Sequence, residues 1–195
     1  MAATASETNV QEKHQKTIAD YVGDMVALES HIEEALDRQL EELKDDPAAL
    51  AAVRQFHDMV KSHRDALIAH QDMTGTTVGS PIKEAGAALL GKAAGLIDRV
   101  RTEANSKALR DDYAAFSLAA ISYSMLFTTA TGLGDDSTAT IAQRNLEDYA
   151  GAIMRINEIM PQVVANELAK DGHQVRTGAV EATRRMVGWS WKSQE

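Results

Sequence analysis

Helical periodicity over most of the chain is the feature that most restricts its fold. In the first long segment, apolar residues recur at helical spacing, mostly three or four positions apart. They are Ile18, Tyr21, Val22, Met25, Leu28, Ile32, Leu36, Leu40 and Leu43. This spacing places their side chains on one face of an α-helix, whereas a half-buried strand would alternate apolar and polar residues. No segment shows that alternation, so the chain is predicted to be all-α.

Proline, glycine and small polar residues mark where the predicted helices begin and end. Asp46 and Ser80 can each cap a helix, and each precedes a proline that suits the first helical turn. Gly132 and Gly134 are suited to ending a helix. The predicted helices cover about 10–44, 47–73, 81–101, 107–131 and 137–169. A disordered polar tail at 1–9 precedes them, and a C-terminal helical tail at 170–195 follows.

The order of these helices predicts one domain at 10–169. Four long helices are joined by short links within each pair and by a long crossover, 74–106, that contains the extra helix. This arrangement favours a ferritin-like antiparallel four-helix bundle over a simple up-and-down bundle. A C-terminal amphipathic helix at roughly 174–189 is expected to follow it. Pro161 lies inside the last long helix and predicts a kink there.

Charge and cysteine content exclude several classes of function. The chain of 195 residues has a formal net charge of −9 and contains no cysteine. Its negative charge disfavours nucleic acid and anionic membranes as partners. The missing cysteines exclude disulfides, zinc–thiolate sites and thiol catalysis. We found no apolar run near the roughly 20 residues that span a bilayer and no signal-peptide core, so a cytoplasmic protein is expected.

A partial metal site is the main chemical feature. A ferritin-like di-iron site takes a carboxylate from each of two helices and a Glu-x-x-His motif from each of the other two. Glu29 lies in phase with the first helix's apolar face, so it is expected either inside the bundle or at its rim beside Glu33. His63 lies on the apolar face of the second helix, but Val60 replaces the glutamate three positions earlier. A histidine there is a metal ligand or, more often, a hydrogen-bonded core residue.

The last two long helices lack several of the residues that a di-iron site requires. Glu147 is followed three positions later by Ala150 instead of histidine, and a border position is as plausible for it as a buried one. The third long helix has Ala119 and Ala120 where a ligand glutamate is expected, one turn before Tyr123. Asp111 and Asp112 come too early and are assigned to the first, solvated turn. The candidate metal ligands are therefore Glu29, His63 and Glu147, about half a di-iron site.

Several segments resemble the YciE/YciF-like stress proteins, a ferritin-like family. The segments are IADYVGDMVALESHIEEAL, FHDMVKSHRDAL, GKAAGLIDRV, YAAFSLAAISYSMLFTTATGLGD and NLEDYAGAI, which together cover about residues 15–165. The resemblance implies a ferritin-like bundle, dimerisation and induction under stress. It also implies that Glu29, His63 and Glu147 lie where such proteins carry metal-site residues, with Ala119 departing from the family's third-helix glutamate.

Three hypotheses about function follow. The first is a non-catalytic, oligomeric stress protein in which Glu29, His63 and Glu147 either bind one metal ion such as iron loosely or survive as a buried polar network. The second is a di-iron oxidase or peroxide-consuming enzyme. The third is a module that docks a partner through its C-terminal tail.

Two aromatic features bear on these hypotheses. Tyr113, Tyr123 and Tyr149 are expected to form core hydrogen bonds or, as an alternative, to lie near a metal or carry redox chemistry. In the tail, the residues Met186, Val187, Trp189 and Trp191 are expected either to close over the bundle or its dimer mate, or to dock a protein partner.

Overall fold

The computed structural model of the chain describes residues 2–43, 46–74 and 104–192. The helices in these ranges are α1 (Ala2–Glu42), α2 (Pro47–Thr74), α4 (Asn105–Leu133), α5 (Asp136–Lys170) and α6 (Ala179–Lys192). The described residues contain no strand. The prediction of an all-α fold is therefore confirmed.

Helix boundaries agree with the sequence in most places and differ at the N-terminus. The first helix begins at Ala2, so residues 2–9, predicted to be a disordered tail, are helical. Three of these eight residues are alanine, the residue with the highest intrinsic helix propensity. The other long helices begin and end within two residues of the predicted positions. The helix predicted at 81–101 lies outside the described residues.

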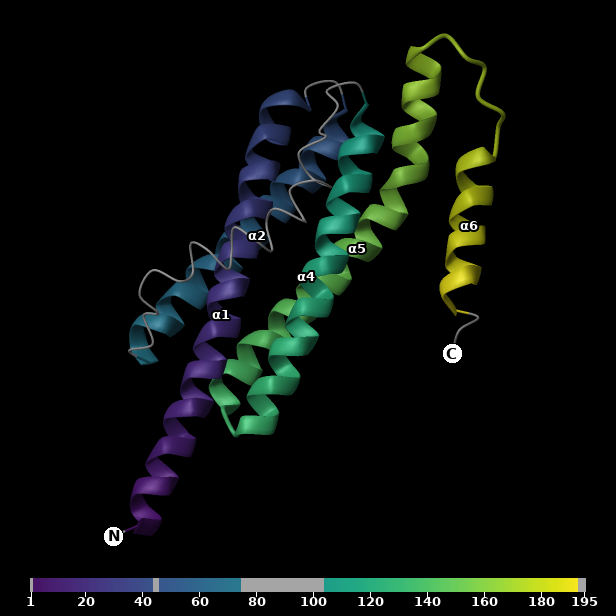
Figure 1. Cartoon of the computed structure of the whole chain (residues 1–195). Helices are drawn as coiled ribbons and strands as arrows, with labels where there is room; N and C mark the ends of the chain where they lie inside the picture. Colours follow the sequence, from purple (N-terminus) through teal and green to yellow (C-terminus); the bar gives the residue numbers. More distant parts are fainter. Residues whose placement is uncertain (1, 44–45, 75–103, 193–195) are drawn as a thin grey trace.

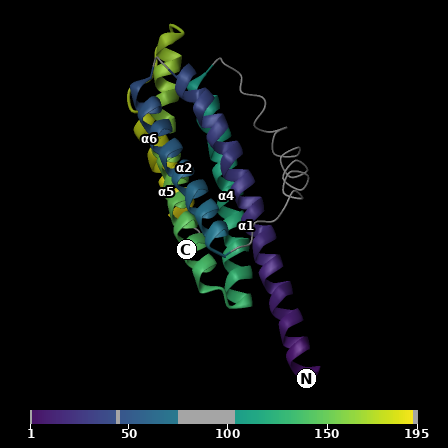
Figure 2. The same ribbon diagram turned by 90° about the vertical axis from the view of Figure 1, so that its left-hand side faces the viewer.

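The long helices pack as two antiparallel pairs. The first pair is α1 with α2 and the second is α4 with α5, and the pairs meet where α1 contacts α4 and α2 contacts α5. Figures 1 and 2 show that α2 and α4 run in the same direction, so α2 ends at the end of the bundle opposite to the one where α4 begins, and this order requires a crossover connection. This crossover distinguishes a ferritin-like topology from an up-and-down bundle.

Local hydrogen bonds explain where these helices begin and end. The carboxylate of Asp46 accepts bonds from the amides of Ala48 at 3.0 Å and Ala49 at 3.1 Å, which caps α2. Gly134 ends α4 with a φ of +77°, a conformation that glycine adopts without a steric penalty. Asp135 then caps α5 by accepting a 2.9 Å bond from the Thr138 amide. In α5, the ribbon bends in the half that carries Pro161 (Figure 1).

The core runs along the centre of the bundle and draws on all four long helices. Aromatic rings fill its middle: Phe56 meets Phe116 edge to face at 5.1 Å between centroids, and Phe116 lies 5.3 Å from Tyr149. Among the described helices, α4 alone is long and apolar enough to cross a membrane by length and composition. This differs from the prediction that the chain has no apolar run of that length. The buried face of α4 includes Phe116, Ala119 and Tyr123, whereas Ile121 and Met125 on the same helix are exposed by 58% and 51%.

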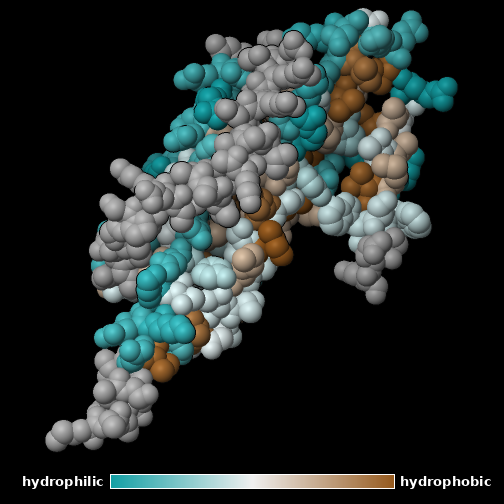
Figure 3. Space-filling view, in the orientation of Figure 1, coloured by the Kyte–Doolittle hydropathy of each residue, from teal (hydrophilic) through white to brown (hydrophobic). Residues whose placement is uncertain are grey.

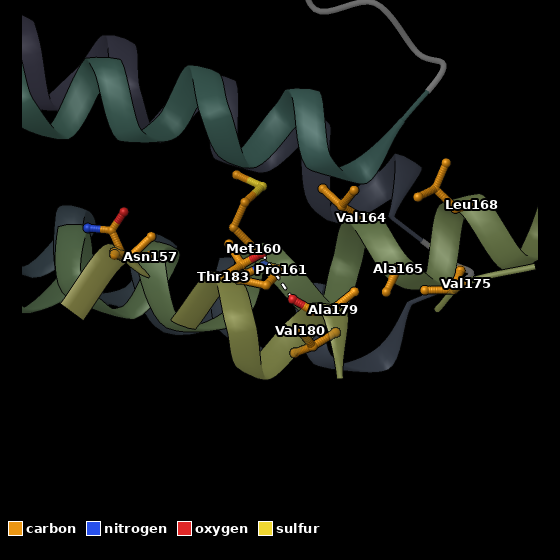
Figure 4. A pocket seen from close by; sticks show the side chains of 11 residues that line it. Asn157, Met160, Pro161, Val164, Ala165, Leu168, Val175, Ala179, Val180 and Thr183 are labelled. Carbon is orange, nitrogen blue, oxygen red and sulfur yellow. Dashed lines mark hydrogen bonds between the residues drawn. The ribbon is translucent and has the colours of Figure 1, made fainter. Parts of the chain in front are cut away.

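The C-terminal helix α6 lies beside α5, outside the four-helix core. Between the two helices is a groove of about 250 Å³ lined by apolar residues that include Met160, Val164 and Val180. Figure 3 shows the hollow with apolar side chains on both sides, and Figure 4 shows the side chains that line it. Of the four tail residues expected to close over the bundle, Val187 lines this groove. The other three are exposed: Met186 by 59%, Trp189 by 72% and Trp191 by 52%.

Candidate functional site

A buried carboxylate at the centre of the bundle is the focus of the polar core. Glu29 lies on α1 and is fully buried. The Tyr123 hydroxyl on α4 donates a 2.5 Å hydrogen bond to its Oε1, and the Tyr149 hydroxyl on α5 donates one of 2.6 Å to its Oε2. Because an unpartnered buried carboxylate costs several kcal/mol, these two phenols are what allows Glu29 to lie in the core.

A buried amide extends this network on the side of Tyr123. The Nδ2 of Asn145 on α5 donates a 2.9 Å hydrogen bond to the Tyr123 hydroxyl oxygen. That oxygen therefore accepts one bond and donates another, which satisfies a buried hydroxyl. Asn145 is itself buried.

His63 on α2 connects the buried carboxylate to the surface. Its Nε2 lies 3.0 Å from an Oδ2 of Asp148, whose side chain is 46% exposed. A carboxylate oxygen accepts a hydrogen bond, so the pair assigns the imidazole proton to Nε2. The other ring nitrogen, Nδ1, lies 3.5 Å from Glu29 Oε1. That distance is too long for a good hydrogen bond, and Nδ1 is buried with no other partner.

The rings of this site pack closely. The His63 ring lies 5.3 Å from the Tyr149 ring and 6.2 Å from the Tyr123 ring, both nearly edge to face. The centroids of the two tyrosine rings are 5.9 Å apart. Such spacings are typical of favourable aromatic pairs and hold the phenol groups in place.

Electrostatics keep both phenols protonated. Burial raises the pKa of the Tyr123 and Tyr149 hydroxyls above its ordinary value, and the neighbouring Glu29 carboxylate raises it further. At neutral pH both groups therefore act as hydrogen-bond donors to the carboxylate.

The residues of this site keep the spacing of a ferritin-like metal centre on α2 and α5. Val60 and His63 are three positions apart on α2, and Asn145 and Asp148 are three positions apart on α5. A di-iron protein carries glutamate and histidine at such pairs. Here valine and asparagine replace the glutamates, and aspartate replaces one histidine.

The other two helices complete the comparison. Glu29 on α1 supplies one carboxylate, and on α4 the group that reaches it is the Tyr123 hydroxyl. Ala119, predicted to stand where the family has its third-helix glutamate, is buried one turn before Tyr123. The donor set holds one fully buried carboxylate with both oxygens already bonded, so it does not fit a two-metal centre. Within 2–43, 46–74 and 104–192, no three His, Asp or Glu side chains are grouped to hold a metal ion.

Of the three predicted ligands, the structure brings two together. Glu29 and His63 meet as described, whereas Glu147 is exposed and accepts a 2.9 Å hydrogen bond from Gln143. Its neighbour Asp148 reaches His63 instead. Their roles as metal ligands remain predictions. Sequence reasoning missed Asn145 and Asp148 and left the tyrosines without a partner, although Asn145 and Tyr149 share the apolar face of α5 with Ala142 and Ala152.

A second buried polar pair lies further along the bundle. Gln39 Nε2 on α1 donates a 2.6 Å hydrogen bond to Asp112 Oδ1 on α4. The assignment of Asp112 to a solvated first turn is wrong: α4 begins at Asn105, and Asp112 is 4% exposed. Burial raises its carboxyl pKa from 3.8 to about 7, Gln39 opposes the shift, and Asp111 adds to it. Asp112 Oδ2 and Gln39 Oε1 are buried without partners.

The topology and the four-helix polar site together define a ferritin-like protein. The chain belongs to the family described as "Domain of unknown function (DUF892)", whose model matches residues 13–169. No curated protein sequence matches the chain.

Two crystal structures share the fold. One is a protein of Xanthomonas campestris, with a TM-score of 0.67, 14% identity and coverage of 82% of this chain and 99% of that chain. The other is the E. coli stress protein YciF, with a TM-score of 0.60, 15% identity and coverage of 78% and 97%. The predicted resemblance to YciE/YciF-like proteins is therefore confirmed.

Proposed function

We propose that this chain is a cytoplasmic, stress-associated ferritin-like protein without a catalytic di-iron centre. One observation carries the proposal: both oxygens of Glu29 accept hydrogen bonds from buried phenols. The buried carboxylate of Glu29 is thus stabilised by hydrogen bonds from the protein itself, without a metal ion. The description of the structurally similar YciF as a stress protein supports the association with stress.

The donor set supports weak iron binding or none. A di-iron centre uses four carboxylates and two histidines, whereas the buried residues here are Glu29, His63, Asn145 and two tyrosines. To bind a metal, Glu29 would have to release at least one phenol, leaving a buried hydroxyl without its partner. Such a loss costs about 1–3 kcal/mol for each group.

The main alternative is a di-iron oxidase or peroxide-consuming enzyme. It requires further carboxylates to enter the core, and the nearest acidic residues on α5 are Glu147 and Asp148. Glu147 is exposed, and Asp148 already binds His63. The geometry therefore favours the non-catalytic function.

Anaerobic iron(II) titration of the metal-stripped protein tests this proposal. We expect no saturable binding near two irons per chain and no diiron absorbance after oxygen or peroxide is added. Glu29→Ala and His63→Ala should leave the iron content unchanged, as should the surface control Glu147→Ala. Binding of two irons per chain that disappears in Glu29→Ala would contradict the proposal and favour the enzyme alternative.

We also propose that the chain forms a homodimer and that α6 takes part in binding a second protein chain. The exposed Met186, Trp189 and Trp191 support this, because aromatic residues dominate the energetics of protein interfaces. Arg184 and Arg185 on the same helix carry positive charge in a chain whose net charge is −9, which favours an acidic partner surface.

A further inference from the structure

We propose that Tyr123 and Tyr149 form a one-electron redox site, in which the phenol proton moves to Glu29 on oxidation and leaves through His63 and Asp148. The inference rests on the proposed function, since it requires that Glu29 be held by the two phenols and not by a metal. It would give the buried network an activity: accepting single oxidising equivalents.

The first step is set by the hydrogen bonds to Glu29. A phenol that loses an electron becomes a strong acid and must give up its proton. Glu29 oxygens lie 2.5 Å from the Tyr123 hydroxyl and 2.6 Å from that of Tyr149, within the reach of direct proton transfer. The raised pKa of both phenols excludes prior formation of a phenolate. Oxidation therefore has to be coupled to transfer of the proton to Glu29.

The electrons and protons of this step balance with an oxidant of the peroxyl-radical class. The radical takes one electron from the phenol and, with a proton from water, becomes a hydroperoxide. The O–H bond of the tyrosine breaks, an O–H bond forms on Glu29, and a neutral tyrosyl radical remains. A one-electron donor of the thiolate class returns the electron, and the phenol regains a proton.

Proton transfer from Glu29 to His63 would give a role to His63 Nδ1, which is buried without a hydrogen-bond partner. His63 Nδ1 carries the free lone pair of the ring and faces Glu29 Oε1 at 3.5 Å. Once the proton of Tyr123 has moved to Glu29 Oε1, that O–H is a donor suited to the lone pair, whereas a proton from Tyr149 arrives on Oε2 and first has to pass to Oε1. Nε2 can then pass its proton to Asp148, whose side chain is 46% exposed to water. The four groups thus connect a fully buried phenol to solvent through one imidazole ring.

Burial would protect the radical. Tyr123 and Tyr149 are both fully buried, so a radical on either ring cannot couple with another molecule. Their ring centroids are 5.9 Å apart, close enough for the two rings to share the oxidising equivalent. Asn145 continues to donate to the Tyr123 oxygen after the proton has left, so this oxygen keeps a partner.

Flash oxidation of the full-length protein tests the proposal. The background carries Trp189→Phe and Trp191→Phe, which remove the exposed, readily oxidised indoles. Light-generated tris(bipyridine)ruthenium(III) is the oxidant, and freeze-quench electron paramagnetic resonance detects the radical. We expect a long-lived tyrosyl signal that survives in Tyr21→Phe and Tyr113→Phe and is lost when Tyr123 and Tyr149 are both replaced by phenylalanine.

Two further variants test the proton path. Glu29→Gln should lower the radical yield by roughly 100-fold, the lower end of what a positioned proton acceptor contributes. His63→Gln should keep the yield but speed radical decay, since a proton held on Glu29 favours return of the electron. Circular dichroism checks folding, and the single variants Tyr123→Phe and Tyr149→Phe replace the double variant if it fails to fold. In each single variant, the tyrosyl signal should then come only from the tyrosine that remains.

A long-lived signal that persists without either tyrosine would overturn the proposal, and so would an unchanged yield in Glu29→Gln. Unchanged decay in His63→Gln would refute the path through histidine. Iron analysis of the same preparation separates this inference from the proposed function. Saturable binding of two irons per chain that depends on Glu29 contradicts the proposed function whatever the radical result, whereas a metal-free, folded protein without the radical contradicts this inference alone.

Discussion

The hydroxyl of Tyr149 on α5 and the carboxylate of Glu29 on α1 meet in a 2.6 Å hydrogen bond at the centre of the bundle. Tyr123 on α4 donates to the other carboxylate oxygen. One side chain of the first helix pair is thereby joined to both helices of the second pair. Hydrogen bonds to an ionised group are about twice as strong as neutral ones, so this contact should contribute to holding the pairs together.

Replacing the buried carboxylate should destabilise the fold. Glu29→Ala leaves two buried hydroxyls without an acceptor, and we expect the free energy of unfolding to fall by about 2–4 kcal/mol. Urea unfolding followed by circular dichroism measures the change. Glu147→Ala is the matched control, because Glu147 is exposed and its loss should alter stability by no more than about 0.5 kcal/mol. Equal effects of the two substitutions would contradict the network.

Removing one phenol oxygen should have a smaller effect. Tyr149→Phe keeps the ring in the core but removes its hydrogen bond to Glu29, and we expect a loss of roughly 1.5–3 kcal/mol, typical of a bond to a charged group. The ring of Tyr113 is partly buried at the edge of the core, so Tyr113→Phe should lower the free energy of unfolding by less. The same urea titrations compare them. If Tyr149→Phe is as stable as the wild type, Glu29 is not held by this phenol.

The raised carboxyl pKa of Asp112 predicts a stability that depends on pH. Its pKa rises on burial from 3.8 to about 7, so between these values the folded chain binds more protons than the unfolded chain. The free energy of unfolding should therefore fall as the pH rises through this window. The protonated form also has a donor for Gln39 Oε1, which is buried without a partner.

Asp112→Asn should remove this dependence. The amide stays neutral and can pair with Gln39 at any pH. We expect the variant to exceed the wild type in unfolding free energy by about 1–3 kcal/mol near pH 8, and the gap to narrow near pH 5. Unfolding titrations at the two pH values test this. Asp111→Asn, at the less buried neighbouring position, is the control, and a gap of equal size at both pH values would contradict the assignment.

Deleting residues 172–195 should separate assembly from folding. The buried hydrophobic core contains no residue of α6, so the truncated chain should keep its helical fold. Self-association should weaken, because the exposed Trp189 and Trp191 are lost. Analytical ultracentrifugation and circular dichroism measure the two effects. An unchanged molecular mass in solution would mean that α6 plays no part in assembly.

Local sequence was enough to predict the four long helices and their order, and to place Glu29 and His63 in phase with apolar faces, although it left Glu29 either inside the bundle or at its rim. Apolar periodicity reports which face of a helix is buried, and residues such as Asp46 and Gly134 act through hydrogen bonds within a few positions of themselves. These features depend on near neighbours in the chain. The fold class and two members of the candidate site could therefore be inferred before any tertiary contact was known.

Which side chains meet in the core was decided only by the tertiary structure. Adjacent helical residues point about 100° apart, so a small error in rotation exchanges Glu147 for Asp148 beside His63. Tyr123 and Tyr149 each lie on an apolar face, and only the packing of the two helix pairs against each other brings both hydroxyls to Glu29. Asp112 is likewise buried because α4 packs against α1 at this position, where Gln39 donates a hydrogen bond to its carboxylate. Such pairings join residues distant in sequence, and no local pattern records them.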